Sequence, residues 1–520
     1  MTSRRFSAGK DRPISRRTVV QSLGAGSLGL LASCGRGAAA SPAPASVYAD
    51  AIGRQQRSRP NIILILLDDL RYDDVSVMPA VQSLLVDQGA SFSNYMTTTP
   101  GCAPARASIL RGQYQHNHGV MRSQGPVGGF ERFHALGHER STVATWLQDA
   151  GYTTALIGKY LNHYPTDDKA TDAVAATYRP PGWDEWAGVT DEGYYKIEVN
   201  ENGQLTRYRG EGQYSTDVFA AMAVDFVART APTGQPFFLN VAPRAPHGPA
   251  EPATRHLSAL AGTIAPRPPS YNEADVSDKP AWVQAIPPLS DEQIAQLDEY
   301  HLARLRTLLA VDELVANLVE ALSNAGVLDS TYILLTSDNG YHLGEHRASL
   351  EKGSPYEEVI RMPLLVRGPD VPAGRTIEAV ASHADLAPTF AAWAGASTPG
   401  FVDGRSLAPL LDRGPIPADW REAVLIEHYA DRTEESKKQP GFSTLRGKDF
   451  TYVEYSTGER ELYDLRQDPY QLDNLAATAD PAYMRGLSRA LASRVTCAGE
   501  ACRTSDAARL PKWPGRERGV

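Results

Sequence analysis

The chain has 520 residues, of which 42% are hydrophobic and 22% are charged, a balance that is ordinary for globular proteins and excludes a disordered or fibrous chain. The formal net charge of −9 and the dispersed basic residues are unlike a nucleic-acid-binding surface, so no nucleic-acid partner is expected. Four cysteines are too few for a disulfide-dense scaffold, and no run of about 20 apolar residues predicts a transmembrane helix.

The N-terminal segment has the composition of an export signal followed by a tether. Residues Ser15-Arg16-Arg17-Thr18 resemble a twin-arginine signal, which implies the twin-arginine export machinery as a partner. Leu31-Ala32-Ser33-Cys34 resembles a bacterial lipobox, which implies cleavage before Cys34 and lipid attachment there. Residues 1–33 are therefore expected to be a signal peptide, and residues 34–58, rich in Ala, Pro, Ser and Gly, a flexible tether.

This organisation predicts an exported protein held by its lipid at the outer face of the cytoplasmic membrane. The apolar stretch after the two arginines is too short and too diluted by Gly and Ser to span a bilayer. The lipid is thus the expected membrane attachment. A plain secretory signal with an incidental cysteine, and hence a secreted protein, is the alternative.

Continuous apolar runs alternate with helical patterns along residues 59–398. Residues 61–67, bounded by Pro60 and Asp68, predict a strand buried on both faces. Further strands are predicted at 153–158, 236–241, 332–336 and 363–366. Helical spacing and capping residues predict helices at 79–89, 141–151 and 291–325. The alternation predicts an α/β domain with a mixed, mostly parallel sheet between helices.

Residues 399–520 show a different pattern. Short alternating segments at 450–455 and 461–465 predict a smaller subdomain with an antiparallel sheet, closed by a helix near 480–493. Cys497 and Cys502 are separated by four residues and are expected to form a local disulfide. Residues 243–288 contain ten prolines and predict a long ordered loop, a feature that is often functional inside a compact domain.

Carboxylates follow two of the predicted strands. Asp68 and Asp69 end the first strand, and Asp338 and Asn339 follow the strand at 332–336. Ligands of open α/β sheets bind beyond the carboxyl ends of the strands, where four oxygen-bearing side chains suit a hard cation. Aspartate after a strand also serves as a helix N-cap, so these pairs alone leave both interpretations open.

Cys102 favours the functional interpretation. The segment Pro100-Gly101-Cys102-Ala103-Pro104-Ala105-Arg106 leads into a helical stretch that ends at Gly112, and Pro104 suits a first helical turn. Cys102 is therefore expected at a helix N-terminus, where backbone N–H groups favour an anion. Arg106 lies one helical turn later on the same face.

The C-x-P-x-R spacing resembles that of the formylglycine-dependent sulfatases, in which the cysteine is oxidised to an aldehyde. The resemblance covers about residues 59–475 and is closest to the branch with N-acetylglucosamine-6-sulfatases and heparan endosulfatases. It implies an alkaline-phosphatase-like fold. The matching elements are Arg59-Pro60-Asn61-Ile62, Gly158-Lys159-Tyr160-Leu161-Asn162, Ala245-Pro246-His247, Ser337-Asp338-Asn339-Gly340, Lys352 and Glu461-Leu462-Tyr463-Asp464-Leu465.

The resemblance also implies roles for individual residues. The catalytic groups are Cys102, Arg106, Lys159, His247 and Lys352. The ligands of one divalent cation are Asp68, Asp69, Cys102, Asp338 and Asn339. Ca²⁺ is favoured over Mg²⁺ because a carboxylate-rich, all-oxygen site suits the larger ion. Formylglycine at position 102 implies a formylglycine-generating enzyme as a further partner.

The chain departs from the family pattern at three positions. Ala105 replaces the usual serine, Arg111 replaces the usual threonine, and Leu161 stands where many sulfatases have a histidine. We expect Asn162 or His163 to take the place of that histidine in substrate binding. His342 is expected to contact the substrate or a side chain that does so. Its spacing to His346 also suits zinc on a helix, but the neighbouring glycines favour a loop.

The leading hypothesis is therefore a sulfatase that hydrolyses sulfate esters of sulfated sugars. A phosphomonoester or phosphodiester hydrolase on the same fold is the first alternative, since one cation and a tetrahedral oxyanion suit either ester. A non-catalytic, glycan-binding surface lipoprotein is the second. Binding alone does not require the cysteine, so the complete set of catalytic residues argues against that second alternative.

Overall fold

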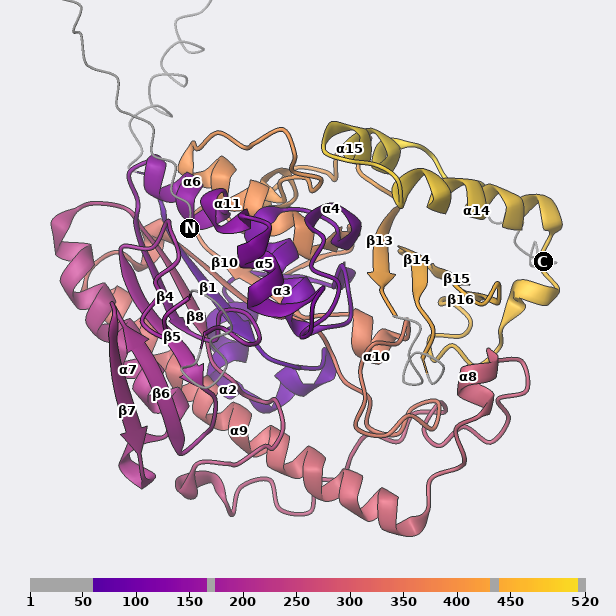
Figure 1. The fold of residues 1–520 in the computed structure, drawn as a ribbon, viewed down its shortest axis with the longest axis horizontal. Helices are drawn as coiled ribbons and strands as arrows, with labels where there is room; N and C mark the ends of the chain where they lie inside the picture. Colours follow the sequence, from indigo (N-terminus) through magenta and orange to yellow (C-terminus); the bar gives the residue numbers. More distant parts are fainter. Residues whose placement is uncertain (1–58, 166–173, 431–438, 513–520) are drawn as a thin grey trace, which may run out of the picture. The chain divides into compact units, whose positions relative to one another are not determined.

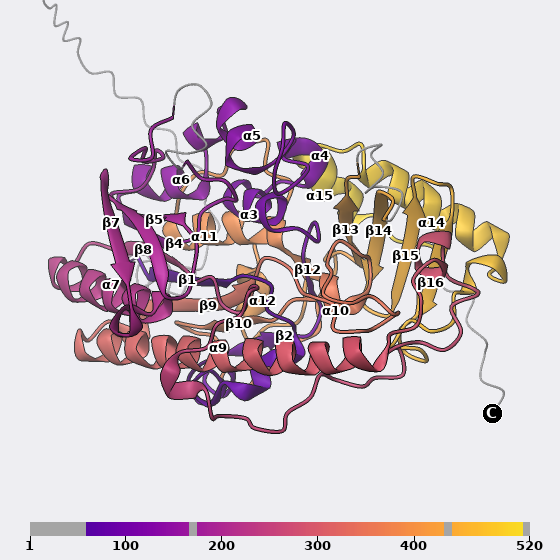
Figure 2. The same ribbon diagram turned by 60° about the horizontal axis from the view of Figure 1, so that its bottom comes forward.

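A ten-stranded mixed sheet forms the centre of the computed structural model, which describes residues 59–165, 174–430 and 439–512 (Figures 1 and 2). The predicted signal peptide and tether lie outside the described residues. In sheet order the strands are β11 (Arg375–Ile377), β2 (Ala90–Phe92), β10 (Leu364–Arg367), β9 (Thr331–Ser337), β1 (Asn61–Leu67), β8 (Phe237–Ala242), β4 (Thr153–Gly158), β5 (Glu185–Asp191), β6 (Lys196–Glu201) and β7 (Gln204–Arg209).

The middle of this sheet is parallel, as the apolar runs predict. Strand β1 pairs in parallel with β8 and β9, and β4 pairs in parallel with β8 and β5. The strand predicted at 363–366 forms as β10 but runs antiparallel to β9. At the other edge β5, β6 and β7 form an antiparallel meander. The fold class predicted from the sequence is thus confirmed.

Helices cover both faces of the sheet because alternate residues of its strands point to opposite sides. Ile62 and Leu64 of β1 belong to one apolar cluster, and Ile63 and Ile65 to the other. The first face is covered by α3 (Cys102–Arg111), α5 (Gly129–Ala135), α6 (Val143–Asp149) and α11 (Leu386–Ala394). The second is covered by α2 (Pro79–Val81), a π-helical turn (Gln82–Val86), α7 (Ser215–Thr230) and α9 (Asp291–Asn324).

The predicted helices form with small differences in their bounds. Helix α9 begins after Ser290, whose hydroxyl accepts a hydrogen bond from the backbone N–H of Gln293, and it ends one residue before the predicted limit. The helix predicted at 79–89 is interrupted, because its α-helical turn passes into the π-helical turn. No helix among residues 59–165, 174–430 and 439–512 has the length and apolar character needed to cross a bilayer.

A second, four-stranded antiparallel sheet forms the predicted C-terminal region. Its strands are β13 (Ala423–His428), β14 (Phe442–Gly447), β15 (Phe450–Tyr455) and β16 (Arg460–Asp464), joined in chain order. Helices α14 (Pro481–Arg494) and α15 (Glu500–Ala507) lie against it (Figure 1). Cys497 and Cys502 form the expected disulfide. The boundary predicted at residue 398 stays a prediction.

The remaining described elements are short. Strands β3 (Tyr95–Met96) and β12 (Ala381–Ser382) pair with each other near the main sheet. The proline-rich stretch at 243–288 is a long loop that contains only brief helical turns, as predicted. The other short helices are α4 (Gln115–His118), α8 (Ala281–Gln284), α10 (Glu357–Ile360) and α12 (Ala408–Leu411).

A buried ionic network joins the two parts of the fold. Arg421, which is fully buried, donates to both oxygens of Asp385 at 2.7 and 3.1 Å and lies 3.3 Å from Asp506 of α15. Both carboxylates are themselves buried. The network thereby connects the start of α11 with the C-terminal helices.

Replacing Arg421 by methionine is expected to destabilise the fold by about 3–5 kcal/mol, because it leaves the buried carboxylate of Asp385 without its counter-charge and Asp506 with Arg494 alone. Chemical denaturation measures the effect. The matched control is Arg509→Met, which removes an arginine paired with the partly exposed Glu422 and should cost about 0–1 kcal/mol. Equal losses in the two variants would contradict this account.

Candidate active site

The carboxyl ends of neighbouring parallel strands bring most of the predicted site residues together. Asp68 and Asp69 follow β1, Asp338 and Asn339 follow β9, and Lys159 follows β4. Strands β9 and β1 are neighbours at the centre of the sheet, and only β8 separates β1 from β4. Their carboxyl ends therefore share one edge, which is the usual location of a ligand site in such sheets.

Cys102 lies at this edge as the first residue of α3, and only 1% of it is exposed. Its Sγ lies 2.8 Å from Nζ of Lys352, 3.5 Å from Oδ1 of Asp68 and 3.9 Å from Oδ1 of Asp69. Gly101 adopts an extended conformation at the N-cap and directs the helix start toward the strand ends. The predicted nucleophile thus contacts predicted metal ligands and a predicted catalytic lysine.

Three cationic side chains face the three carboxylates. Lys159 Nζ lies 2.5 Å from Asp68, and Lys352 Nζ lies 2.6 Å from Asp69. Arg106 donates from Nε to Asp338 at 2.8 Å and from a terminal nitrogen to the carbonyl of Lys159 at 3.0 Å. The arginine therefore joins α3 to two strand ends.

The charges of this cluster fix its protonation states. Burial alone would raise the pKa of Asp68, but Lys159, His247 and Arg106 outweigh burial and hold that pKa well below its usual range. Burial raises the pKa of the Cys102 thiol, because the nearby Lys352 offsets the loss of solvent only in part. The thiol is therefore protonated near neutral pH, while the carboxylate of Asp68 is charged.

The acidic residues fit a hard divalent cation. Ligand atoms of Asp68, Asp69, Cys102 and His247 lie within 4.8 Å of one another. Oδ1 of Asn339 is buried without a hydrogen-bond partner in the described part of the chain, while its amide nitrogen donates to Asp69 at 2.6 Å. A buried amide oxygen beside carboxylates is the type of donor that Ca²⁺ and Mg²⁺ use.

Asp69 has an unusual backbone conformation, with φ at 67°. Its N–H donates to Oδ1 of Asp338 at 3.2 Å, and its carbonyl accepts from the buried guanidinium of Arg304 at 2.5 Å. Non-glycine residues at positive φ are uncommon, although aspartate is among the more tolerant. Such conformations concentrate at functional sites, where the surrounding structure holds them.

His247 lies beside the cluster with one ring nitrogen free to face it. Its Nδ1 lies 2.6 Å from the carbonyl of Gly248, and its Nε2 lies 3.7 Å from Oδ2 of Asp69. Tyr194, which precedes strand β6, donates to the backbone carbonyl of His247 at 2.9 Å. The turn between β5 and β6 thereby helps to hold the proline-rich loop in place.

Sequence reasoning missed two charged residues next to these groups. Arg244 donates to Glu192 at 2.8 Å, and the same Glu192 oxygen lies 3.9 Å from Nζ of Lys159. Arg244 precedes His247 by three residues, so its position could have been noticed. Glu192 follows strand β5, and no local sequence pattern marks it as a residue of the site.

Two cavities lie next to the cluster. Asn162 and His163 line a polar cavity of about 670 Å³ together with Glu192. Lys352 and Gly101 line a second cavity, of about 250 Å³, to which the C-terminal sheet contributes His428. The residues predicted to bind substrate at 162 and 163 are thus located beside the predicted catalytic groups.

His342 is placed differently. Only 1% of it is exposed, its Nε2 lies 2.7 Å from Oγ of Ser354, and it is not among the residues lining the two cavities beside the cluster. Its role in substrate binding stays a prediction. The five-residue stretch from His342 to His346 is a loop, as the glycines predict.

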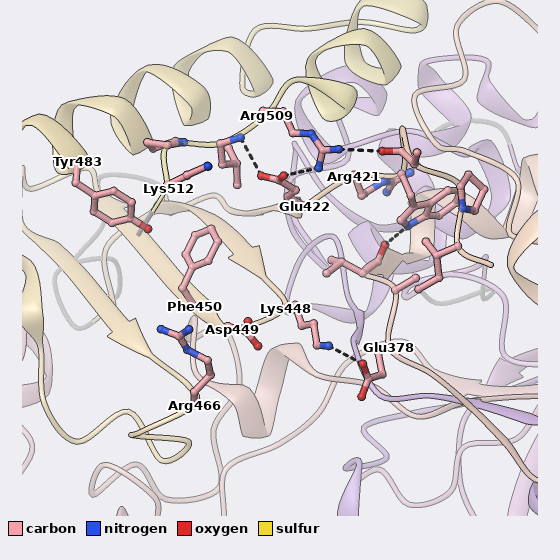
Figure 3. A pocket seen from close by; sticks show the side chains of 18 residues that line it. Glu378, Arg421, Glu422, Lys448, Asp449, Phe450, Arg466, Tyr483, Arg509 and Lys512 are labelled. Atoms are coloured by element: carbon pink, nitrogen blue, oxygen red, sulfur yellow. Dashed lines mark hydrogen bonds and ion pairs between the residues drawn. The ribbon is translucent and has the colours of Figure 1, made fainter. Parts of the chain in front are cut away.

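A larger cavity, of about 730 Å³, lies elsewhere. Figure 3 shows it between the C-terminal sheet and the last described residues, with Phe450 and Tyr483 in its wall. Its rim contains the ion pairs Lys448–Glu378 and Arg509–Glu422. None of the predicted catalytic or metal-binding residues lines it.

The family models cover nearly all of the described chain. The model described as Sulfatase matches residues 60–396, and the model described as N-sulphoglucosamine sulphohydrolase, C-terminal, matches residues 344–496. The chain belongs to the sulfatase family. It is therefore a sulfuric ester hydrolase, and the alternative of a non-catalytic glycan-binding protein is set aside.

Relatives of this sulfatase confirm the predicted branch. N-acetylglucosamine-6-sulfatase from Homo sapiens is 32% identical over 484 residues, which cover 86% of this chain and 86% of the relative. A solved structure of a protein in complex with its substrate, D-glucosamine-2-N,6-O-disulfate, is 26% identical with a TM-score of 0.69 and covers 86% of this chain and 98% of that one.

The fold is also shared with another class of ester hydrolase. The phosphonate monoester hydrolase of Agrobacterium radiobacter is 22% identical to this sulfatase, with a TM-score of 0.65, and covers 84% of this chain and 95% of that one. At this identity the likeness shows the fold alone. Fold does not determine function, so the chemistry has to be argued from the residues of the site.

Proposed function

We propose that this sulfatase hydrolyses sulfate esters of sulfated saccharides, with formylglycine formed from Cys102 as the nucleophile. The observation that carries the proposal is the position of Cys102 at a helix start, in contact with Lys352 and close to Asp68 and Asp69. The saccharide class is supported by the relative named N-acetylglucosamine-6-sulfatase and by the solved structure whose substrate is D-glucosamine-2-N,6-O-disulfate.

The hydrated aldehyde at position 102 carries two hydroxyl groups. One hydroxyl attacks sulfur, and the alcohol of the substrate leaves. The second hydroxyl then loses its proton and expels sulfate, which restores the aldehyde. This is covalent catalysis with a nucleophile that regenerates itself.

The surrounding residues stabilise the charge that develops on the sulfate group. Lys159 and Lys352 would contact the sulfate oxygens, and Arg106 would hold the hydrate. Asp68, Asp69, Asp338, Asn339 and residue 102 would hold one divalent cation, Ca²⁺ being favoured over Mg²⁺. When bound, that cation would polarise a sulfate oxygen and lower the pKa of the hydrate.

His247 is placed to protonate the departing oxygen. Since its Nδ1 faces the carbonyl of Gly248, the proton available for transfer is at Nε2. Nε2 also faces the cluster, since it lies 3.7 Å from Oδ2 of Asp69. A positioned histidine of this kind typically contributes about 10²–10⁴-fold to rate.

Turnover of a panel of esters tests the proposed substrate class. We expect release of sulfate from 6-O-sulfated glucosamine derivatives with a higher kcat/KM than from an aryl sulfate, because the polar cavity at Asn162 and His163 offers hydrogen bonds to sugar hydroxyls. A higher kcat/KM for the aryl sulfate than for every saccharide tested would contradict the proposed substrate class but not the proposed sulfatase chemistry.

A phosphomonoester or phosphodiester hydrolase remains the second candidate, favoured by the fold shared with the phosphonate monoester hydrolase. Sulfate and phosphate esters both present a tetrahedral oxyanion to the same cationic side chains and divalent ion. The same preparation is therefore assayed on paired aryl sulfate and aryl phosphate esters. A larger kcat/KM for the phosphate would replace the proposed function by this second candidate.

We also propose export by the twin-arginine machinery and attachment by a lipid at Cys34, supported by Arg16, Arg17 and the lipobox-like sequence. Replacing Cys34 by alanine should leave the enzyme active and exported but release it from the membrane. Fractionation of cells with an activity assay on each fraction measures this. A Cys34→Ala enzyme that stays with the membrane would rule out the lipid anchor.

A further inference from the structure

We infer that the C-terminal sheet sets the position of Lys352 in the active site, and that Tyr356 is the positioning residue that transmits this constraint. The inference rests on the proposed role of Lys352. Lys352 lies on a loop, residues 351–356, that contains neither helix nor strand. Its location at the cluster therefore depends on the contacts that fix the ends of that loop.

The first constraint is a buried carboxylate on β16. Glu461 is fully buried, and its Oε1 accepts hydrogen bonds from the hydroxyls of Tyr356 at 2.8 Å and of Tyr463 at 2.7 Å. Its Oε2 accepts from Tyr455 of β15 at 2.7 Å. Burial raises the pKa of Glu461, and the three tyrosine hydroxyls oppose that rise. The carboxyl group thus joins the Lys352 loop to two strands of the C-terminal sheet.

The second constraint acts on Glu357, the residue that follows Tyr356. Glu357 receives two hydrogen bonds from Arg446 of β14, at 2.6 and 2.8 Å. Such bidentate pairs restrict both distance and direction. The backbone N–H of Glu357 also donates to Gln471 at 2.9 Å. Residues 356 and 357 are therefore both anchored to the C-terminal region.

The loop is held on its other side as well. The N–H of His342 donates to the carbonyl of Glu351 at 2.9 Å, and Nε2 of His342 lies 2.7 Å from Oγ of Ser354. The ring of Tyr356 stacks on that of His346, with centroids 3.9 Å apart. His342 and Tyr356 thus fix the segment on both sides of Lys352.

The distances at the active site show why the position of the Lys352 loop affects catalysis. Nζ of Lys352 lies 2.6 Å from Asp69 and 2.8 Å from Sγ of Cys102, although a quarter of its side chain is exposed. A lysine side chain is long and loses much conformational freedom when it is held. A displacement of about 1 Å in a reacting group costs up to about 10²-fold in rate.

The test uses two tyrosines that donate to the same carboxylate. Tyr356→Phe removes the bond between Glu461 and the Lys352 loop, whereas Tyr455→Phe removes an equivalent bond that does not reach the loop. Thermal unfolding and the formylglycine content of each variant, by mass spectrometry, are measured first. We expect similar unfolding temperatures for the two variants, and a kcat that is roughly tenfold lower at nearly unchanged KM for Tyr356→Phe alone.

A double-mutant cycle separates positioning from general destabilisation. In a Lys352→Ala background, Tyr356→Phe should cause no further loss of kcat, because its effect acts through the lysine that has been removed. The inference would be overturned if the losses in kcat of the two single variants multiplied in the double variant. It would also be overturned if Tyr356→Phe and Tyr455→Phe had equal effects on kcat. If Lys352→Ala alone leaves kcat unchanged, the proposed role of Lys352 itself fails.

Discussion

Replacing Cys102 by alanine should lower kcat for sulfate-ester hydrolysis by on the order of 10⁴-fold or more, the range seen when a catalytic nucleophile is removed. The fold should be retained, because the side chain is small and its neighbours are charged groups that pair with one another. Steady-state kinetics and thermal unfolding measure the two effects. Mass spectrometry of the tryptic peptide from the wild-type enzyme should show an aldehyde at position 102 instead of a thiol.

The matched control for this experiment is Ala105→Ser, which restores the residue usual in the family motif on the same helix. It should keep full turnover per formylglycine and raise or leave unchanged the fraction of chains that carry it. Fully active enzyme in which every chain retains an unmodified thiol would refute the covalent mechanism.

Removal of divalent cations should abolish activity, and adding back Ca²⁺ should restore it more completely than Mg²⁺. Three buried carboxylates at the strand ends face three cationic side chains, so a bound divalent ion would give the site an excess of positive charge. That excess favours an anionic sulfate ester and stabilises its transition state. Metal analysis of the protein and activity after dialysis against a chelator measure the dependence.

Thermal unfolding gives a second readout that needs no turnover. Ca²⁺ should raise the unfolding temperature of the wild-type protein, because a ligand that binds only the folded state stabilises it. The same addition should have no effect on an Asp69→Ala variant. Full activity in a preparation shown to be free of metal would exclude the proposed ligand set.

Much of the fold is predictable because its signals are local. The apolar run at 61–67 forms the central strand, since a strand covered on both faces by helices needs no polar side. Gly112 ends α3 with φ at 65°, the conformation in which glycine ends helices. The carboxylates after β1 and β9 lie together because parallel strands end at the same edge.

Other features have no local signal. The hydrogen bond from Tyr356 to Glu461 joins residues 105 positions apart, and neither residue differs in pattern from an ordinary core tyrosine or strand glutamate. Glu192 also has no local signal, because its position near Lys159 depends on where the meander β5–β7 lies. The antiparallel direction of β10 follows from the path of the preceding loop, which residues 363–366 do not encode by themselves.

The near-complete burial of Cys102 bears on when its side chain can be modified relative to folding. Under the proposed mechanism, a modifying enzyme must reach the thiol before α3 packs against the strand ends, so that oxidation and folding would compete for the same newly made polypeptide. A chain that folds first would be stable and well formed but permanently inert, since its cysteine is no longer accessible. The specific activity of a preparation would then depend on the fraction of chains whose Cys102 was converted before folding. Faster expression should yield protein of equal stability in which fewer chains carry formylglycine.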